Sequence, residues 1–156
     1  MKARCTVVNR STTETDIKLT LDVDGCGKAS IDTGIGFFNH MLVLLAKHSL
    51  MDINITCKGD LEVDGHHTVE DVGIVLGSAL KEALGDKRSI NRYGSSTIPM
   101  DETLVSVHID ISGRPYFLFN GEVPRGMVGQ FDVQLLEEFL RALAYNGGIT
   151  MHVIIH

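Results

Sequence analysis

The sequence has no tryptophan, only three cysteines and three prolines, and no cluster of basic residues. The cysteines, Cys5, Cys26 and Cys57, are widely spaced and form no CxxC pair, which argues against a disulfide framework or a zinc site and predicts reduced thiols of a cytoplasmic protein. A formal net charge of −6 without a basic cluster argues against nucleic acid as a partner. No run of about 18 uncharged apolar residues is present, and residues 1–4 lead into no apolar signal segment. We therefore expect neither a membrane span nor a secretory signal.

The sequence contains enough apolar residues to form one hydrophobic core, and it has an unusual number of histidines. Its 156 residues are 44% apolar, which fits a single domain, 1–156. Seven residues are histidine, and two adjacent ones lie in the run DGHHTVED at positions 64–71. That run leads into an apolar-periodic segment, 69–84, which predicts a helix.

The spacing of the polar side chains in this run predicts how they divide. On a helix, neighbouring side chains point about 100° apart, whereas side chains four positions apart share a face. His66 and Glu70 can therefore bind one ion together, while His67 points elsewhere, toward a second ion with Asp71 or toward a remote ligand. Imidazole and carboxylate donors suit a borderline divalent metal such as Mn, Fe, Zn, Co or Ni. Ordinary helix capping, with carboxylates that complement the helix dipole, explains the same residues without a metal.

The first half of the chain predicts an ordered series of strands and helices. The clearest strand is 15–23, in which apolar residues alternate with polar ones. A second helix before the 69–84 segment is indicated by apolar residues at helical spacing. The remaining expected elements are strands at 4–10, 28–32 and 51–57 and this helix at 37–48. The order is β-β-β-α-β-α, and it ends near Leu84 and Gly85, a helix stop.

The same order then begins again. Residues 102–113 repeat residues 14–25 at an offset of 88 positions, with the Glu, Thr, Asp and Gly residues coincident. The helical segment 136–144 repeats 38–46 at an offset of 98 positions. Residues 116–119 take the place of the third strand, and residues 149–155 take the place of the fourth. The sequence therefore predicts an α+β fold made by internal duplication, with a first repeat at 1–90 and a second at 91–156.

The duplication makes two further predictions. His40 and Glu138 occupy the same position in their two helices, so each is a potential metal ligand. A second HHxxE run, placed at the offset of 98, would begin at position 164, beyond His156. We therefore expect the second repeat to lack its last helix in this chain, and the face of its sheet to stay bare.

Five stretches together carry a resemblance to a known family. They are RSTTET at 10–15, DTGIGFFNHML at 32–42, HHTVEDVG at 66–73, PMDE at 99–102 and SGRP at 112–115. Over its whole length the chain resembles the imidazoleglycerol-phosphate dehydratase family of histidine biosynthesis. The resemblance implies ferredoxin-like halves, also described as ribosomal S5 domain 2-like. It also implies a cytoplasmic enzyme made of trimers that build a 24-subunit shell, with the active site between subunits.

The resemblance also implies a metal centre with two Mn²⁺ ions per active site. His66 and Glu70 match ligands of one ion, and His40 and His67 match ligands of the other. Glu138 matches a ligand position that is often histidine in the family. The remaining ligands would come from a second HHxxE run.

The implied reaction is a lyase reaction that dehydrates D-erythro-imidazole-glycerol phosphate to imidazole acetol phosphate through a metal-bound imidazolate. Arg92 and Arg114 match phosphate-binding positions, and forked guanidinium donors suit phosphate oxygens. His48 and Glu14 match substrate contacts, and Glu14 is the candidate for acid–base catalysis. Four of the metal-ligand positions also line the substrate site: His40, His66, His67 and Glu70.

Two other functions fit some of the same residues. A non-catalytic metal-binding assembly protein would use the HHxxE run but would leave Glu14 and the two arginines without a purpose. A metal-dependent phosphoester hydrolase would use the metals and the arginines, and it would release inorganic phosphate. The product of the dehydratase keeps its phosphate, so a phosphate-release assay separates the two reactions.

Overall fold

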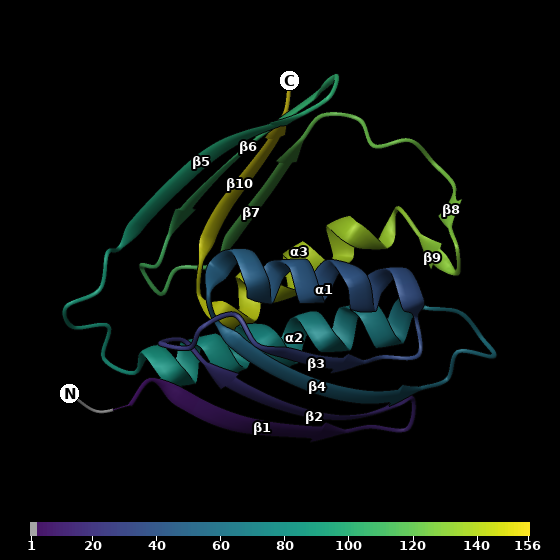
Figure 1. Ribbon diagram of the computed structural model, residues 1–156, viewed down its shortest axis with the longest axis horizontal. Helices are drawn as coiled ribbons and strands as arrows, with labels where there is room; N and C mark the ends of the chain where they lie inside the picture. Colours follow the sequence, from purple (N-terminus) through teal and green to yellow (C-terminus); the bar gives the residue numbers. More distant parts are fainter. Residues whose placement is uncertain (1–2) are drawn as a thin grey trace.

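The computed structural model describes residues 3–156, which form two four-stranded sheets with helices between them (Figure 1). The elements of the first half are β1 (Cys5–Ser11), β2 (Thr15–Asp22), β3 (Ala29–Asp32), α1 (Gly36–Ser49), β4 (Asp52–Gly59) and α2 (His66–Leu84). Those of the second half are β5 (Tyr93–Met100), β6 (Thr103–Asp110), β7 (Tyr116–Asn120), β8 (Met127–Val128), β9 (Phe131–Asp132), α3 (Leu135–Gly147) and β10 (Thr150–Ile155). This is the predicted α+β fold.

The two sheets have the same topology. Their strand orders are β1-β2-β4-β3 and β5-β6-β10-β7, and in each the last pair is parallel and the other pairs are antiparallel. The register is also the same: Leu19 lies opposite Ile55, and Val107 lies opposite Val153. These pairs are related by the offsets of 88 and 98 positions found in the sequence. The internal duplication is therefore confirmed.

Three features differ from the sequence prediction. Helix α2 begins at His66, three positions before the expected start at 69, because the Asp64 carboxylate accepts a hydrogen bond from the His66 N–H at 2.7 Å and turns the chain into the helix. Strand β5 was not predicted, since Gly94 and the adjacent serines give it no apolar alternation. The short β8–β9 hairpin, which comes before α3, was also not predicted.

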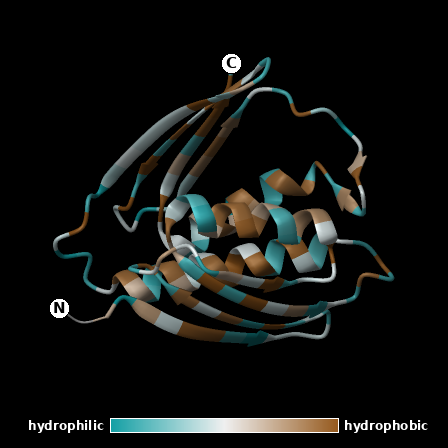
Figure 2. Cartoon of the chain, in the orientation of Figure 1, coloured by the Kyte–Doolittle hydropathy of each residue, from teal (hydrophilic) through white to brown (hydrophobic). Residues whose placement is uncertain are grey.

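The main core lies between the first sheet and the helices, where the apolar bands of the strands meet those of the helices (Figure 2). Leu19 and Leu21 are fully buried there against α2, whereas Val107 and Ile109, their equivalents in the second sheet, are only half-buried. Within residues 3–156 the apolar residues of the second sheet pack against Leu80 of α2 and against Leu140 and Leu143 of α3.

None of the helices in the described part of the chain is long and apolar enough to cross a membrane. Cys5, Cys26 and Cys57 are all free thiols, as expected from their spacing. Burial raises the pKa of the Cys57 thiol to about 11, so this residue is an inert part of the core.

Candidate functional site

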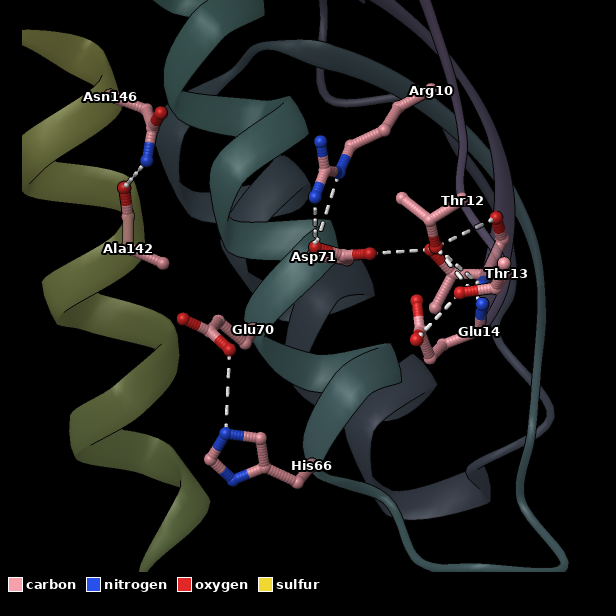
Figure 3. Close-up of polar contacts among 10 residues, drawn as sticks. Arg10, Thr12, Thr13, Glu14, His66, Glu70, Asp71, Ala142 and Asn146 are labelled. Carbon is pink, nitrogen blue, oxygen red and sulfur yellow. Dashed lines mark hydrogen bonds and ion pairs between the residues drawn. The ribbon is translucent and has the colours of Figure 1, made fainter.

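The first turn of α2 directs its polar side chains to two different sides. His66 Nε2 lies 3.3 Å from Glu70 Oε2, and both side chains extend toward α3 (Figure 3). His66 also lines a cavity of about 750 Å³ together with Glu138 from the first turn of α3. Because the helix begins at His66, the predicted i, i+4 pair forms within a regular turn. The structure thus brings His66 beside its predicted partner Glu70 and onto the same cavity as Glu138, another predicted metal ligand.

His67 points away from that cavity and is held by a carboxylate that the sequence prediction missed. Its Nδ1 lies 2.9 Å from Oδ2 of Asp60, the residue that follows β4. The hydrogen bond to Asp60 raises the pKa of His67, and it directs the imidazole so that Nε2 is the nitrogen open to a further ligand. The second oxygen of Asp60, Oδ1, is buried and has no hydrogen-bond partner among residues 3–156.

Asp71 does not join His67 as a potential metal ligand, which was one of the two arrangements left open by the sequence. Its Oδ1 accepts hydrogen bonds from Arg10 Nε and Nη2 at 3.1 and 2.9 Å, and its Oδ2 accepts one from the Thr15 hydroxyl. The carboxylate is therefore fully engaged with the β1–β2 hairpin. The other arrangement, in which His67 shares an ion with a ligand remote in the sequence, stays a prediction.

Glu14 lies at the tip of this hairpin, in a turn that its own threonines close. The Thr12 hydroxyl accepts hydrogen bonds from the backbone N–H groups of Glu14 and Thr15 at 3.1 and 2.9 Å. The Thr13 hydroxyl donates to Glu14 Oε1 at 2.7 Å and lowers the pKa of this exposed carboxyl group. The charges of Glu14 and His67 also act on each other, which helps to lower the pKa of the glutamate and to raise the pKa of the histidine.

The two predicted phosphate-binding arginines lie together, but far from Glu14 in the same chain. Arg92 is bound to Asp110 through hydrogen bonds of 2.6 and 3.0 Å, and the charge of Arg114 also acts on Asp110. Both lie beyond the C-terminal end of α2. Gly113, which precedes Arg114, lies against the side chain of Lys87, and Lys87 follows the last residue of α2 by three positions. A helix of 19 residues is about 28 Å long. The arginines and the histidines of one chain are therefore at opposite ends of α2.

The other two predicted site residues are on α1. His40 is exposed in the first half of the helix, and His48 is exposed in its last turn, where an imidazolium complements the helix dipole.

The donors present fit a divalent metal in type but do not complete a site. Within the described residues 3–156, no three His, Cys, Asp or Glu side chains converge on one point. Each face of the α2 start offers an imidazole beside a carboxylate, the donor pair that Mn²⁺ and related ions accept. Such a pair is a half-site that needs further donors.

Sequence reasoning could have found Asp60 from one signal, a carboxylate at the end of a strand shortly before two adjacent histidines. For Arg10 the only signal was its position at the start of the RSTTET run. Its partner Asp71 lies 61 positions away, and no local pattern connects the two.

The fold and the site define a duplicated α+β enzyme that gathers imidazole and carboxylate groups around the start of one helix. A sequence model of the imidazoleglycerol-phosphate dehydratase family matches residues 33–156. The chain belongs to that family of lyases of histidine biosynthesis.

Curated relatives and solved structures agree with this assignment. An imidazoleglycerol-phosphate dehydratase of Acetivibrio thermocellus is 60% identical over 146 residues, which cover 94% of this chain and 75% of that protein. One from Clostridium kluyveri is 56% identical with the same coverage. The crystal structure of the enzyme from Staphylococcus aureus superposes with a TM-score of 0.86 at 42% identity, covering 97% of this chain and 83% of that one. A Pyrococcus furiosus structure gives a TM-score of 0.80 at 37% identity, covering 95% and 78%.

Proposed function

We propose that this protein dehydrates D-erythro-imidazole-glycerol phosphate to imidazole acetol phosphate, in an active site built between subunits. The observation that supports this most directly is the first turn of α2, where His66 lies 3.3 Å from Glu70 and the neighbouring His67 interacts electrostatically with the exposed Glu14 of the hairpin. The reaction removes a proton from carbon and expels a hydroxyl group, so it needs a base next to groups that can bind the imidazole ring.

Two Mn²⁺ ions are the proposed cofactors. His66 and Glu70 would hold one ion, with Glu138 as a further donor on the same cavity. His67, oriented by Asp60, and His40 would hold the other. When bound to the ring nitrogens of the substrate, the metals would lower the nitrogen pKa and make the ring an electron sink.

Glu14 is the proposed proton acceptor. Its lowered pKa keeps it a carboxylate at neutral pH, which is the form that a base requires. The carbon that loses its proton has no neighbouring carbonyl group, so the ring supplies electrons that expel the adjacent hydroxyl group as hydroxide with its C–O bonding pair. The pair from the broken C–H bond, whose proton Glu14 accepts, then forms the enol double bond and returns the electrons to the ring. Glu14 is a candidate to return its proton to the enol carbon, which gives the ketone, while the enol O–H proton passes to the hydroxide to form water.

Arg92 and Arg114 are the proposed phosphate ligands, and we propose that they act in a site shared with a second subunit. They lie at the other end of α2 from the histidines of their own chain, and α2 is about 28 Å long, more than a glycerol phosphate with one ring can span. The arginines and His48 of one subunit would therefore complete a site begun by Glu14 of another. This geometry supports self-association. The trimers that build a 24-subunit shell, and the location in the cytoplasm, are proposed from the family resemblance alone.

The first experiment is a direct assay on the assembled, manganese-loaded protein. We expect consumption of imidazole-glycerol phosphate without release of inorganic phosphate. Phosphate release would instead indicate the hydrolase. A metal spectrum unaffected by this substrate, together with no turnover, would indicate the non-catalytic assembly protein.

The second experiment replaces Glu14 with Gln, which removes the base but keeps the shape. Because a positioned base contributes about 10²- to 10⁴-fold, we expect turnover to fall by that factor while manganese content stays at the wild-type level. Glu122→Gln is the matched control, since Glu122 is exposed in the loop after β7. Unchanged turnover of Glu14→Gln would remove Glu14 from the mechanism.

A further inference from the structure

The buried carboxylate of Asp71 connects the hairpin of Glu14 to the helix of His67. Asp71 is 8% exposed and lies one helical turn after His67 on α2. Its side chain points to the hairpin, on the side of α2 opposite to His66 and Glu70 (Figure 3). A buried carboxylate without partners strongly destabilises a folded protein, so leaving its hydrogen-bond donors would be costly for Asp71.

Those donors come from both strands of the hairpin. Arg10 lies near the end of β1, four positions before Glu14, and Thr15 is the first residue of β2, immediately after it. Thr15 is 3% exposed, and its N–H donates to the Thr12 hydroxyl that also accepts the Glu14 N–H. Asp71 therefore holds the chain on both sides of Glu14, through charge-assisted hydrogen bonds that fix direction as well as distance.

The second repeat shows that the register of the hairpin does not depend on Arg10. Its hairpin, β5–β6, has the same register: Ile98 lies opposite Val105 as Arg10 lies opposite Ile17. The residue equivalent to Arg10 is thus Ile98, an exposed apolar side chain that binds no carboxylate. The β5–β6 hairpin therefore pairs in the same register with an apolar residue in place of the arginine, so the pairing of the two strands does not require Arg10.

We propose that Asp71 is a positioning residue, which acts with Arg10 and Thr15 to set the Glu14 carboxylate relative to the α2 turn that bears His67. The inference rests on the proposed function, because it assigns to the cluster the alignment of the base in that reaction. Misplacing a catalytic group by about 1 Å costs on the order of 10²-fold in rate. The cluster would supply this precision to a residue that is itself exposed.

The test is a double-mutant cycle in the full-length, assembled, manganese-loaded protein. Asp71→Asn keeps the shape but removes the charge that binds Arg10. We expect kcat to fall by about 10- to 100-fold, with KM and manganese content close to wild type. In the Glu14→Gln background the same substitution should cause no further loss, because Asp71 acts through Glu14. Asp24→Asn, which breaks the exposed Arg4–Asp24 pair on the same sheet, is the control and should leave kcat unchanged.

A second pair of variants keeps the proposal testable if Asp71→Asn folds poorly. Thr15→Val removes the hydroxyl at nearly constant volume and should reproduce the loss of kcat. Thr15→Ser retains the hydroxyl and should keep kcat close to the wild-type value. Amide hydrogen exchange should become faster at Glu14 and Thr15 in Thr15→Val but stay slow at Leu19 in the core of β2.

The outcomes separate this inference from the proposed function. Wild-type kcat in Asp71→Asn and Thr15→Val would overturn the positioning role, as would an additional loss in the Glu14→Gln background or faster exchange throughout β2. If Glu14→Gln itself keeps full turnover, the proposed mechanism fails instead. The hydrogen-exchange comparison would then still report whether the cluster orders the hairpin.

Discussion

At the scale of single residues, the contact between Asp60 and His67 decides which nitrogen faces a ligand and when the imidazole is charged. The carboxylate accepts from Nδ1, which fixes the ring and leaves Nε2 for a metal. The same contact raises the pKa of His67, so protons compete for this residue up to a higher pH than for a free histidine. Orientation and proton affinity thus have one cause.

Asp60→Asn should therefore change how the stability of the metal-free protein depends on pH. A histidine with a raised pKa in the folded state contributes stability fully below its unfolded value of 6.5, and this contribution is lost as pH rises through the raised value. We expect the variant to lose more stability at about pH 6 than at about pH 8.5, measured by urea unfolding. NMR titration of the His67 ring should show its pKa lowered.

Asp24→Asn is the control for this measurement. The hydrogen bond from Arg4 lowers the pKa of Asp24, so its contribution disappears only as pH falls below 3.8. The slope between about pH 6 and 8.5 should stay that of the wild type. An Asp60→Asn protein with the wild-type slope would show that Asp60 does not set the pKa of His67.

Sequence reasoning could predict the His66–Glu70 pair because both residues belong to one helix, where spacing alone determines direction. It could not predict the fixation of His67 or Asp71. Their partners Asp60 and Arg10 come from other elements, and the distance between them is set by how β1 and β4 pack on α2. The resemblance to known sequences supplied the remaining candidates, but not their placement at opposite ends of α2.

At the scale of elements, the crossing of α2 and α3 depends on two buried glycines. A Cβ atom on Gly77 would lie 2.5 Å from the carbonyl oxygen of Leu143 and 2.8 Å from the backbone nitrogen of Gly147. A Cβ atom on Gly73 would lie 2.7 Å from the carbonyl oxygen of Phe139. The two glycines are four positions apart and share a face of α2, so the helices approach backbone to backbone. This close approach also holds Glu138, in the first turn of α3, on the cavity of His66.

Gly77→Ala should therefore destabilise the protein, although alanine is the better helix former by about 1 kcal/mol. The backbone of α3 cannot yield as a flexible side chain would, and overpacking of this kind costs about 1–3 kcal/mol. We expect a lower free energy of unfolding in urea. Gly36→Ala at the start of α1 is the matched control, because its Cβ would meet nothing within 4 Å. A Gly77→Ala protein more stable than wild type would contradict the close approach.

The elements also show where periodicity succeeds and fails as a predictor. The strand at 15–23 was found because each alternate residue is buried, and the structure has β2 at Thr15–Asp22. Strand β5 was missed because almost every residue in it is exposed. An edge strand of a half-covered sheet has no buried side to mark it in the sequence.

At the scale of the whole molecule, duplication gives two sheets with the same strand register, but the helices bury the first sheet more completely than the second. The first sheet is packed against α2, and the second shares only α3 and the C-terminal part of α2 with the rest of the core. Leu80, Leu140 and Leu143 contact both apolar clusters, so they join the two halves. The repeat visible in the sequence thus predicted the topology of each half. It did not predict this joint, which is built from residues of α2 and α3 alone.

The difference in cover predicts unequal effects of the same substitution at equivalent positions. Leu21 and Ile109 occupy the same place in β2 and β6, and their side chains have equal carbon number. Leu21 is 0% exposed beneath α2, so Leu21→Ala should leave a closed cavity and lower the free energy of unfolding by about 3 kcal/mol. Ile109 is only half-buried, so Ile109→Ala in the chain by itself should cost about half as much, because less apolar surface returns to water. Urea denaturation of the isolated chain measures both values. Equal losses would mean that another subunit or segment covers the second sheet in solution, and Ile109 would then be protected from solvent as Leu21 is.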